Sequence, residues 1–235
     1  MEIKKNWELS PAHFGPLWKY VEDDEITDID FNGTDLWITN TSNERTKVSD
    51  HGVTKEFIEK FSHYVANNVS KPFNKVDNLL EADTETLRIS IVHETSAISG
   101  RSVCIRKTLP SVRMTRETMI EEGYCSRDIL VLLENCVHAR MNFVFCGEPG
   151  VGKTEGIKFF SQCIAPNERV ITIEDTPELH YKEINPEKDC VEFMVSDGFD
   201  YTKAIKTSLR QNPKWLMLSE ARSVEVKNLM ECLST

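Results

Sequence analysis

Apolar and polar residues alternate near the start of the chain. Residues 25–31 alternate loosely, and residues 36–39 form a second short strand-like run after the pair Asn32-Gly33. Asn-Gly between two such runs is the strongest short-range signal for a hairpin. We therefore predict two antiparallel strands joined by a tight turn.

A helical period replaces this alternation after residue 54. Phe57, Phe61 and Val65 recur every four residues, and Thr54 stands where a helix N-cap is expected. Strand-like runs return at residues 86–93 and 101–107. Together these elements predict an α+β domain over residues 1–107, with the helix packed on the sheet.

The pattern changes again beyond residue 107. Residues 108–116 contain a proline and few apolar residues, which predicts a linker between domains. The chain then shows an amphipathic helix at residues 126–139 and an all-apolar run, typical of a buried parallel strand, at residues 142–146. A second helix follows at residues 153–164 and a second buried strand at residues 169–173. This βαβ order predicts an α/β domain over residues 117–235.

Composition narrows the classes of function. The formal charge of the 235 residues is −10, and acidic residues outnumber basic ones in both halves. Such a chain has no electrostatic footprint for nucleic acid, so we expect no direct nucleic-acid binding.

Cysteine usage and hydropathy indicate the compartment. The seven cysteines form no CxxC pair, and their odd number argues against a complete set of disulfides and favours a reducing cytosol. No apolar run approaches the roughly 20 residues that span a bilayer, so a membrane role would be peripheral and through partners.

A glycine-rich motif lies between the predicted strand at residues 142–146 and the helix that follows it. It matches G-x-x-x-x-G-K-[ST], the phosphate-binding loop of nucleoside triphosphatases. Small residues let backbone N–H groups surround phosphates, the lysine reaches the β and γ oxygens, and the hydroxyl binds Mg²⁺. The predicted ligand is Mg·ATP, and the predicted binding residues are Gly147, Glu148, Pro149, Gly150, Val151, Gly152, Lys153 and Thr154.

Two acidic residues end later apolar runs. Glu174 follows residues 171–173, and Glu220 follows residues 215–219. Carboxylates at this end of parallel strands lie where ligands bind in such sheets. One would hold Mg²⁺ and the other would orient the attacking water; the alternative is that each merely caps the next helix. The six histidines have no metal-binding spacing, so we expect them on the surface or in loops.

These blocks together resemble the type II/type IV secretion traffic ATPases, most closely the CpaF-like branch of Tad pilus and conjugation motors. The resemblance extends over nearly the whole chain. It includes the N-terminal opening at residues 14–33, the strand at 100–107, the phosphate-binding loop, an "Asp box" at 173–178 and a Walker B region at 209–222.

This resemblance implies a fold, a site and an assembly. The fold would be an N-terminal α+β domain followed by a RecA-like P-loop NTPase domain of α/β class. Glu174 would be the general base and Glu220 would act on Mg²⁺ with Thr154, although the two carboxylates could exchange roles. Arginines of the N-terminal domain contact phosphates in this family, and the matching positions are Arg88, Arg101 and Arg106. Strand-edge ion pairs are the alternative role for these arginines.

The resemblance also implies a homo-hexameric ring that works in the cytoplasm on inner-membrane secretion or pilus components. The chain departs from the family at Ser219 and Asn212, where glycine and arginine are usual. It stops at Thr235, where the family would enter its histidine box, so we expect an NTPase domain incomplete at its C-terminus. From this we predict retained nucleotide binding with weak or absent turnover.

Two other functions stay open at the level of sequence. One is a nucleotide-binding scaffold without turnover. The other is a nucleic-acid motor or nucleotide kinase on the same P-loop core; the acidic charge and the lack of a lid-like arginine cluster after the loop count against it. The sequence does not distinguish a secretion system from a conjugation or pilus machine.

Overall fold

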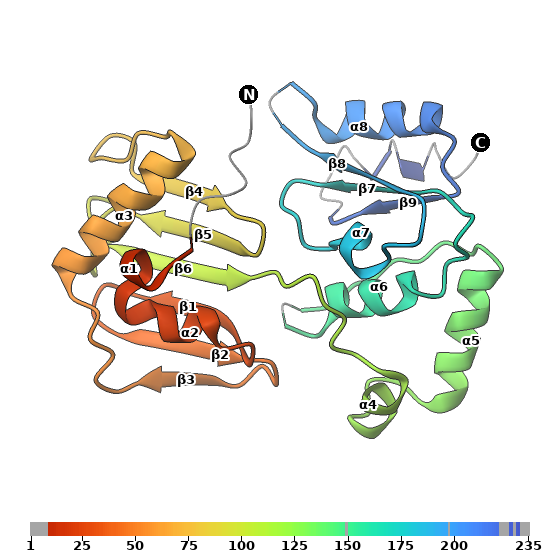
Figure 1. The fold of residues 1–235 in the computed structure, drawn as a ribbon, viewed down its shortest axis with the longest axis horizontal. Helices are drawn as coiled ribbons and strands as arrows, with labels where there is room; N and C mark the ends of the chain where they lie inside the picture. Colours follow the sequence, from red (N-terminus) through yellow and green to blue (C-terminus); the bar gives the residue numbers. More distant parts are fainter. Residues whose placement is uncertain (1–8, 149, 197, 221–225, 228, 231–235) are drawn as a thin grey trace. The chain divides into compact units, whose positions relative to one another are not determined.

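A computed structural model describes residues 9–148, 150–196, 198–220, 226–227 and 229–230. The chain divides into two compact units, residues 1–109 and 110–235. This boundary lies inside the predicted linker at 108–116. Each unit is described by itself below (Figure 1).

The N-terminal unit contains a six-stranded sheet in the order β3-β2-β1-β6-β5-β4, in which every neighbouring pair is antiparallel. The predicted hairpin is present as β1 and β2, and the two later predicted strands are β5 and β6. The strands are β1 (Ile26–Phe31), β2 (Leu36–Asn40), β3 (Arg45–Val48), β4 (Leu79–Asp83), β5 (Leu87–Val92) and β6 (Ser102–Lys107).

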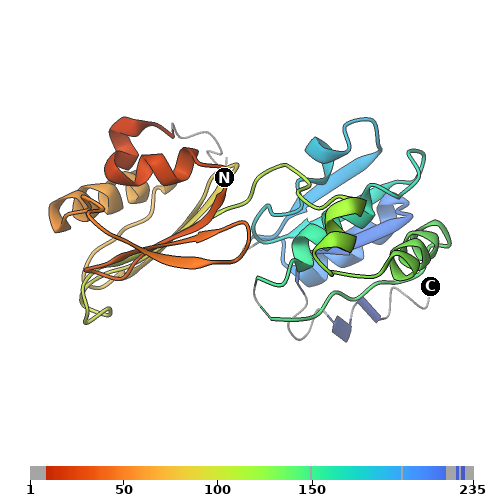
Figure 2. The ribbon, with the colours of Figure 1, turned by 90° about the horizontal axis from the view of Figure 1, so that it is seen from below.

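Helices cover one face of this sheet (Figure 2). The predicted helix is α3 (Lys55–Val69), and the Thr54 side chain caps it by accepting a hydrogen bond from the Phe57 backbone N–H. Short helical segments precede the sheet, namely α1 (Pro11–Phe14), the 3-10 turn η1 (Gly15–Leu17) and α2 (Trp18–Glu22). Their apolar side chains and those of the sheet form one core that includes Phe14, Ile58, Phe61, Ile89 and Ile105.

The turn between β1 and β2 requires its glycine. Gly33 has φ of +102°, and a Cβ there would lie 2.5 Å from the Ser99 carbonyl oxygen in the β5–β6 loop. The Asn32 side chain closes the turn by accepting from the backbone N–H groups of Thr34 and Asp35 at 3.1 and 2.8 Å. The Asn-Gly signal in the sequence therefore marks a real turn and also a close approach between two loops.

The C-terminal unit contains a parallel sheet in the order β8-β7-β9. Its strands are β7 (Val170–Glu174), β8 (Cys190–Met194) and β9 (Trp215–Leu218). Its helices are α4 (Arg116–Glu121), α5 (Arg127–His138), α6 (Lys153–Ser161), α7 (Tyr181–Ile184) and α8 (Tyr201–Ser208), with the 3-10 turn η2 (Leu209–Gln211) before β9. Among the residues that the structure describes, none of the helices has the length and apolar character needed to cross a membrane.

Alternate residues of β7 contribute to two different cores. Ile171 and Ile173 pack with residues of α8, whereas Val170 packs with Phe160 of α6 and Tyr181 of α7. Accordingly α8 lies on one face of the sheet and α6 and α7 lie on the other (Figure 1). Because side chains alternate along a strand, Glu174 extends toward the face that α6 and α7 cover.

The predicted buried strand at residues 142–146 is wrong. This segment is irregular, and Val144 is 90% exposed. Only Phe143 and Phe145 pack inward, where both rings lie near the Phe160 ring. A buried parallel strand needs cover on both faces, and this apolar run is covered on one. The predicted βαβ unit around α6 therefore lacks its first strand, and the parallel pairing is found in β7, β8 and β9.

Candidate functional site

The phosphate-binding motif forms a loop that ends on a helix. Gly147, Gly150 and Gly152 have φ of +151°, +82° and +81°, a region that other residues rarely adopt. A Cβ on Gly147 would lie 2.9 Å from Val151 Cγ2, so a larger residue there would require the Val151 side chain to move. Gly152 caps α6, whose first residue is Lys153. Pro149 lies outside the described residues.

The polar groups of this loop fit a bound triphosphate. Lys153 Nζ donates to the carbonyl oxygens of Gly147 and Glu148 at 3.0 and 2.8 Å, so its ammonium group lies over the loop. Thr154 lies half-buried in the first turn of α6, where helix N–H groups have no intrahelical partner. A lysine, a hydroxyl and free backbone donors at a helix start are the donors that Mg·phosphate groups require.

Glu174 is a buried carboxylate at the end of β7. It is 5% exposed, and its Oε2 accepts from the backbone N–H groups of Glu178 and Leu179 at 2.9 and 3.0 Å. Burial raises the pKa of Glu174 to about 7, and the neighbouring carboxylates of Glu192 and Glu178 act in the same direction. The two hydrogen bonds oppose this shift. A carboxylate with a pKa near neutrality is suited to take a proton at physiological pH.

Glu220 follows β9 and is half-buried. The backbone N–H of Ser219 donates to the Ile173 carbonyl oxygen at 3.1 Å, which continues the pairing of β9 with β7 up to the residue before each acid. Glu174 and Glu220 therefore lie at the carboxyl ends of two adjacent parallel strands, at the same edge of the sheet. Beside them, the Tyr201 hydroxyl of α8 lies 3.2 Å from the Ser219 hydroxyl.

The three predicted phosphate-contacting arginines lie in the N-terminal unit. Arg88 is on β5, where it is register partner to Arg106 on β6. The Arg106 side chain donates to Asp28 at 2.7 Å. Arg101 precedes β6 and forms a two-pronged pair with Glu94 at 2.7 and 3.0 Å. Two of the three arginines, Arg101 and Arg106, thus form ion pairs within the N-terminal unit, which was the alternative role given to them from the sequence. That the three arginines contact phosphate stays a prediction.

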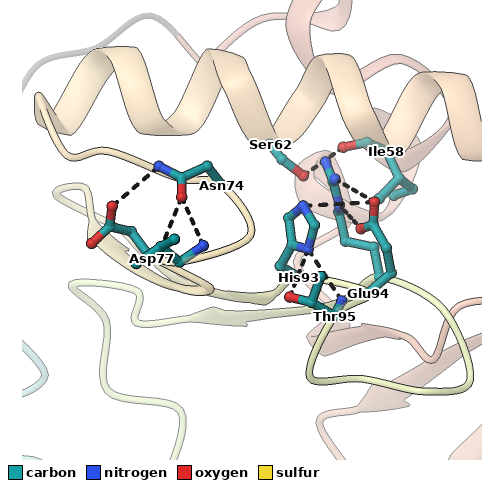
Figure 3. A network of polar contacts seen from close by, with 9 residues as sticks. Ile58, Ser62, Asn74, Asp77, His93, Glu94 and Thr95 are labelled. Carbon is teal, nitrogen blue, oxygen red and sulfur yellow. Dashed lines mark hydrogen bonds and ion pairs between the residues drawn. The ribbon is translucent and has the colours of Figure 1, made fainter.

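The Arg101–Glu94 pair is well ordered by its surroundings. The Arg101 side chain is 10% exposed and its guanidinium lies 5.3 Å from the centre of the Phe73 ring. The hydrogen bond from Arg101 lowers the pKa of Glu94 to about 2. His93 and Thr95 flank Glu94, and His93 Nδ1 lies 3.1 Å from the Thr95 hydroxyl (Figure 3).

Sequence patterns missed a second group of charged residues on α6. Lys158 is 3% exposed, and its Nζ lies 3.8 Å from the Glu155 carboxylate. Glu155 in turn accepts from the Arg113 guanidinium at 3.2 Å. Burial lowers the pKa of Lys158, and Glu155, Glu178 and Glu174 oppose that shift. Only the one-turn spacing of Glu155 and Lys158 could have indicated a pair.

Two histidines lie in loops, as predicted, but are buried. His93 follows β5 and His180 precedes α7, and they are 7% and 4% exposed. His93 contacts Thr95 and packs edge-on against Phe73, which explains its burial. Within the described ranges, no group of three or more histidine, cysteine, aspartate or glutamate side chains could hold a metal ion.

Comparison with known proteins gives one family. The model of the family described as "Type II/IV secretion system protein" matches residues 76–235. An uncharacterized protein of Bacillus anthracis is 28% identical over 210 residues, which cover 89% of this chain and 47% of that protein. Protein VirB11 of Rhizobium radiobacter is 36% identical over 153 residues, which cover 58% of this chain and 43% of that protein.

A solved structure is also similar. The crystal structure of the VirB11 ATPase from the Brucella suis type IV secretion system, in complex with sulphate, matches 95% of this chain and 72% of that chain, with 22% identity and a TM-score of 0.43. The chain spans less than half the length of the Bacillus and Rhizobium relatives.

Proposed function

Because this chain belongs to the family of type II/IV secretion system proteins, we propose that it binds Mg·ATP through residues 147–154 and hydrolyses it as a motor subunit of a secretion, conjugation or pilus machine. One observation supports this most directly. Three glycines with positive φ lead into α6, and Lys153 is its first residue. That arrangement surrounds phosphate oxygens with backbone donors and a cation.

Each polar residue then has a distinct role. Lys153 would exchange its two loop carbonyl partners for β and γ phosphate oxygens. Thr154 and Glu220 would hold Mg²⁺, which neutralises charge on the phosphates during transfer. Glu174 would orient the attacking water and take its proton, because its carboxylate is buried and its pKa of about 7 is near ambient pH. Arg101 and Arg106 would need to leave or share their ion pairs with Glu94 and Asp28 to reach phosphate, and Arg88 would act beside Arg106.

The assembly is part of the same proposal. The resemblance to traffic ATPases supports a homo-hexameric ring for the whole protein, peripheral to the inner face of the membrane and docked on inner-membrane components. The machine that the protein powers would be a type IV secretion, conjugation or Tad-type pilus system. The NTPase domain would be RecA-like.

Phosphate release tests this function. The Glu174→Gln protein should bind Mg·ATP like the wild type but release phosphate about 100-fold more slowly, because it has lost its proton acceptor. Lys153→Ala should lose both binding and release, and Lys206→Ala on the exposed side of α8 should lose neither. Oligomeric mass is recorded in the same samples by light scattering. Loss of binding in none of the variants, or equal phosphate release by the wild type and Glu174→Gln, would contradict the proposed site. Binding with no release by the wild type is the weak or absent turnover predicted from the sequence, and it would favour a nucleotide-binding scaffold over a motor for this chain.

A further inference from the structure

Residues 112–124, here called the clamp segment, lie against the first turns of α6. Two contacts join Arg113 to Glu155, which is the third residue of that helix. The Arg113 backbone N–H donates to one carboxylate oxygen at 3.1 Å, and its guanidinium donates to the other at 3.2 Å. Both oxygens of Glu155 are thus engaged by one residue from outside the phosphate-binding motif.

Two glycines at the start of α6 lie in close contact with other residues of the clamp segment. A Cβ on Gly152 would lie 2.7 Å from Met114 Cε, and a Cβ on Gly156 would lie 2.8 Å from Tyr124 Oη. The Tyr124 hydroxyl also donates to the Gly152 carbonyl oxygen at 3.5 Å. Glycine inside a helix is unfavourable relative to alanine, so the place of Gly156 in α6 calls for a packing reason. The Tyr124 hydroxyl supplies it, together with the Phe145 ring, whose Cε1 would lie 3.3 Å from the same Cβ.

These contacts converge on the helix start that presents Lys153 and Thr154. We propose that Arg113, Met114 and Tyr124 are positioning residues for the phosphate-binding loop: they hold the first turn of α6 so that Lys153 and Thr154 face the phosphates. The proposal rests on the proposed function. Two of the three residues are at the surface, since Tyr124 is 41% exposed and the Arg113 side chain is 42% exposed, whereas Met114 also packs against the core of this unit. Loss of Arg113 or Tyr124 should therefore alter the loop more than the core.

A second anchor of the same segment offers a matched control. Arg116 pairs with Glu134 of α5, and neither residue belongs to α6. Removing that ion pair perturbs the clamp segment at a site away from the phosphate-binding loop. A merely structural role for the segment would make Arg113 and Arg116 equivalent in their effect on nucleotide affinity.

The test introduces a steric clash between residue 156 and the Tyr124 hydroxyl and then removes it with a second substitution. Gly156→Ala should displace Tyr124, because the new Cβ would meet its hydroxyl, and should weaken Mg·ATP binding about tenfold. Tyr124→Phe alone should weaken binding by less than Gly156→Ala does, since it keeps the ring and loses one long hydrogen bond. In the double variant the clashing hydroxyl is gone and the Phe145 ring, at 3.3 Å, needs to move by only a few tenths of an ångström, so affinity should return to within about threefold of the wild type. Arg113→Ala should weaken binding severalfold, and Arg116→Ala should not.

Calorimetric titration with Mg·ATP and the melting temperature are measured on the same samples. Rescue of affinity by the second substitution, without a matching change in melting temperature, would support the positioning role. Loss of affinity in Gly156→Ala that Tyr124→Phe does not rescue, or equal affinity in all variants, would overturn it. If the wild type itself binds no ATP, the proposed function fails and the positioning role fails with it. Failure of the positioning role alone would instead appear as normal binding by the wild type without the expected differences among the variants.

Discussion

Glu174 shows how one buried group gives the C-terminal unit a dependence on pH. Its pKa is about 7 in the folded protein and near 4.5 in an unfolded chain. Between these values the folded state keeps a proton that the unfolded state has lost, so stability falls as pH rises through this window. The cost arises because burial disfavours the carboxylate more than two backbone N–H donors favour it.

Glu174→Gln should remove this dependence. Between pH 4.5 and 7.5 the wild type should lose about 3 kcal/mol of unfolding free energy relative to the variant. Glutamine has an oxygen that can still accept from Glu178 and Leu179. Hydrogen exchange of the β7 amides at both pH values reports this unit alone, and Glu117→Gln on exposed α4 serves as control. A pH slope shared by the wild type and Glu174→Gln would contradict the assignment.

Lys158 is a buried lysine, and although burial lowers its pKa, the carboxylates of this site act to raise it. Its charge lies near the Glu155, Glu178 and Glu174 carboxylates, while Glu192 approaches Glu174 from β8. Lys158→Met removes the cation and keeps much of the volume, so the pKa of Glu174 should rise further above 7. Carbon-13 NMR titration of the Glu174 carboxyl measures this directly. An unchanged or lower Glu174 pKa in Lys158→Met, with Lys203→Met as reference, would show that the two groups do not interact.

At the scale of elements, local signals predicted what local forces determine. The Thr54 cap, the Asn32-Gly33 turn and the apolar period of α3 each act within a few residues, and each is present in the structure. By contrast, β3 was missed because three of its four residues are exposed at a sheet edge and show no apolar alternation. The segment 142–146 was misassigned because apolar content does not reveal whether one face or two are covered.

The cap of α3 gives an element-scale prediction. Thr54 accepts from the Phe57 backbone N–H at 3.1 Å. Thr54→Ala should lower the stability of the N-terminal unit by about 1 kcal/mol, whereas Thr54→Ser keeps the hydroxyl and should lower it by less. Chemical unfolding followed by hydrogen exchange within β5 and β6 measures the difference. Equal losses for alanine and serine would mean that the hydrogen bond contributes nothing.

The candidate site was predictable in part. A motif with fixed spacing identified Gly147 to Thr154, and the acid after an apolar strand identified Glu174. The roles of these residues remain predictions. Lys158, Arg113 and Tyr124 escaped detection because their importance depends on tertiary packing: a buried lysine, a distant ion pair, and a tyrosine that fits over a helix glycine. No spacing rule encodes such contacts.

For the whole molecule, charge and family limit the partners. The chain has a formal charge of −10 and belongs to the type II/IV secretion system proteins. Phosphate backbones would be repelled by such a surface, so a fluorescent DNA duplex should show no change in anisotropy on adding the protein, even at low salt. DNA should likewise not stimulate phosphate release. Salt-sensitive binding of the duplex would revive a nucleic-acid motor.

The central claim is that residues 147–154 bind ATP, and a calorimetric titration of Mg·ATP into the wild type and Lys153→Ala tests it most directly. Lys206→Ala controls for the loss of one lysine. The account predicts saturable one-site binding by the wild type and by Lys206→Ala, and none by Lys153→Ala. Equal binding by all three proteins would place the nucleotide elsewhere, and binding by none would contradict the assignment of this loop.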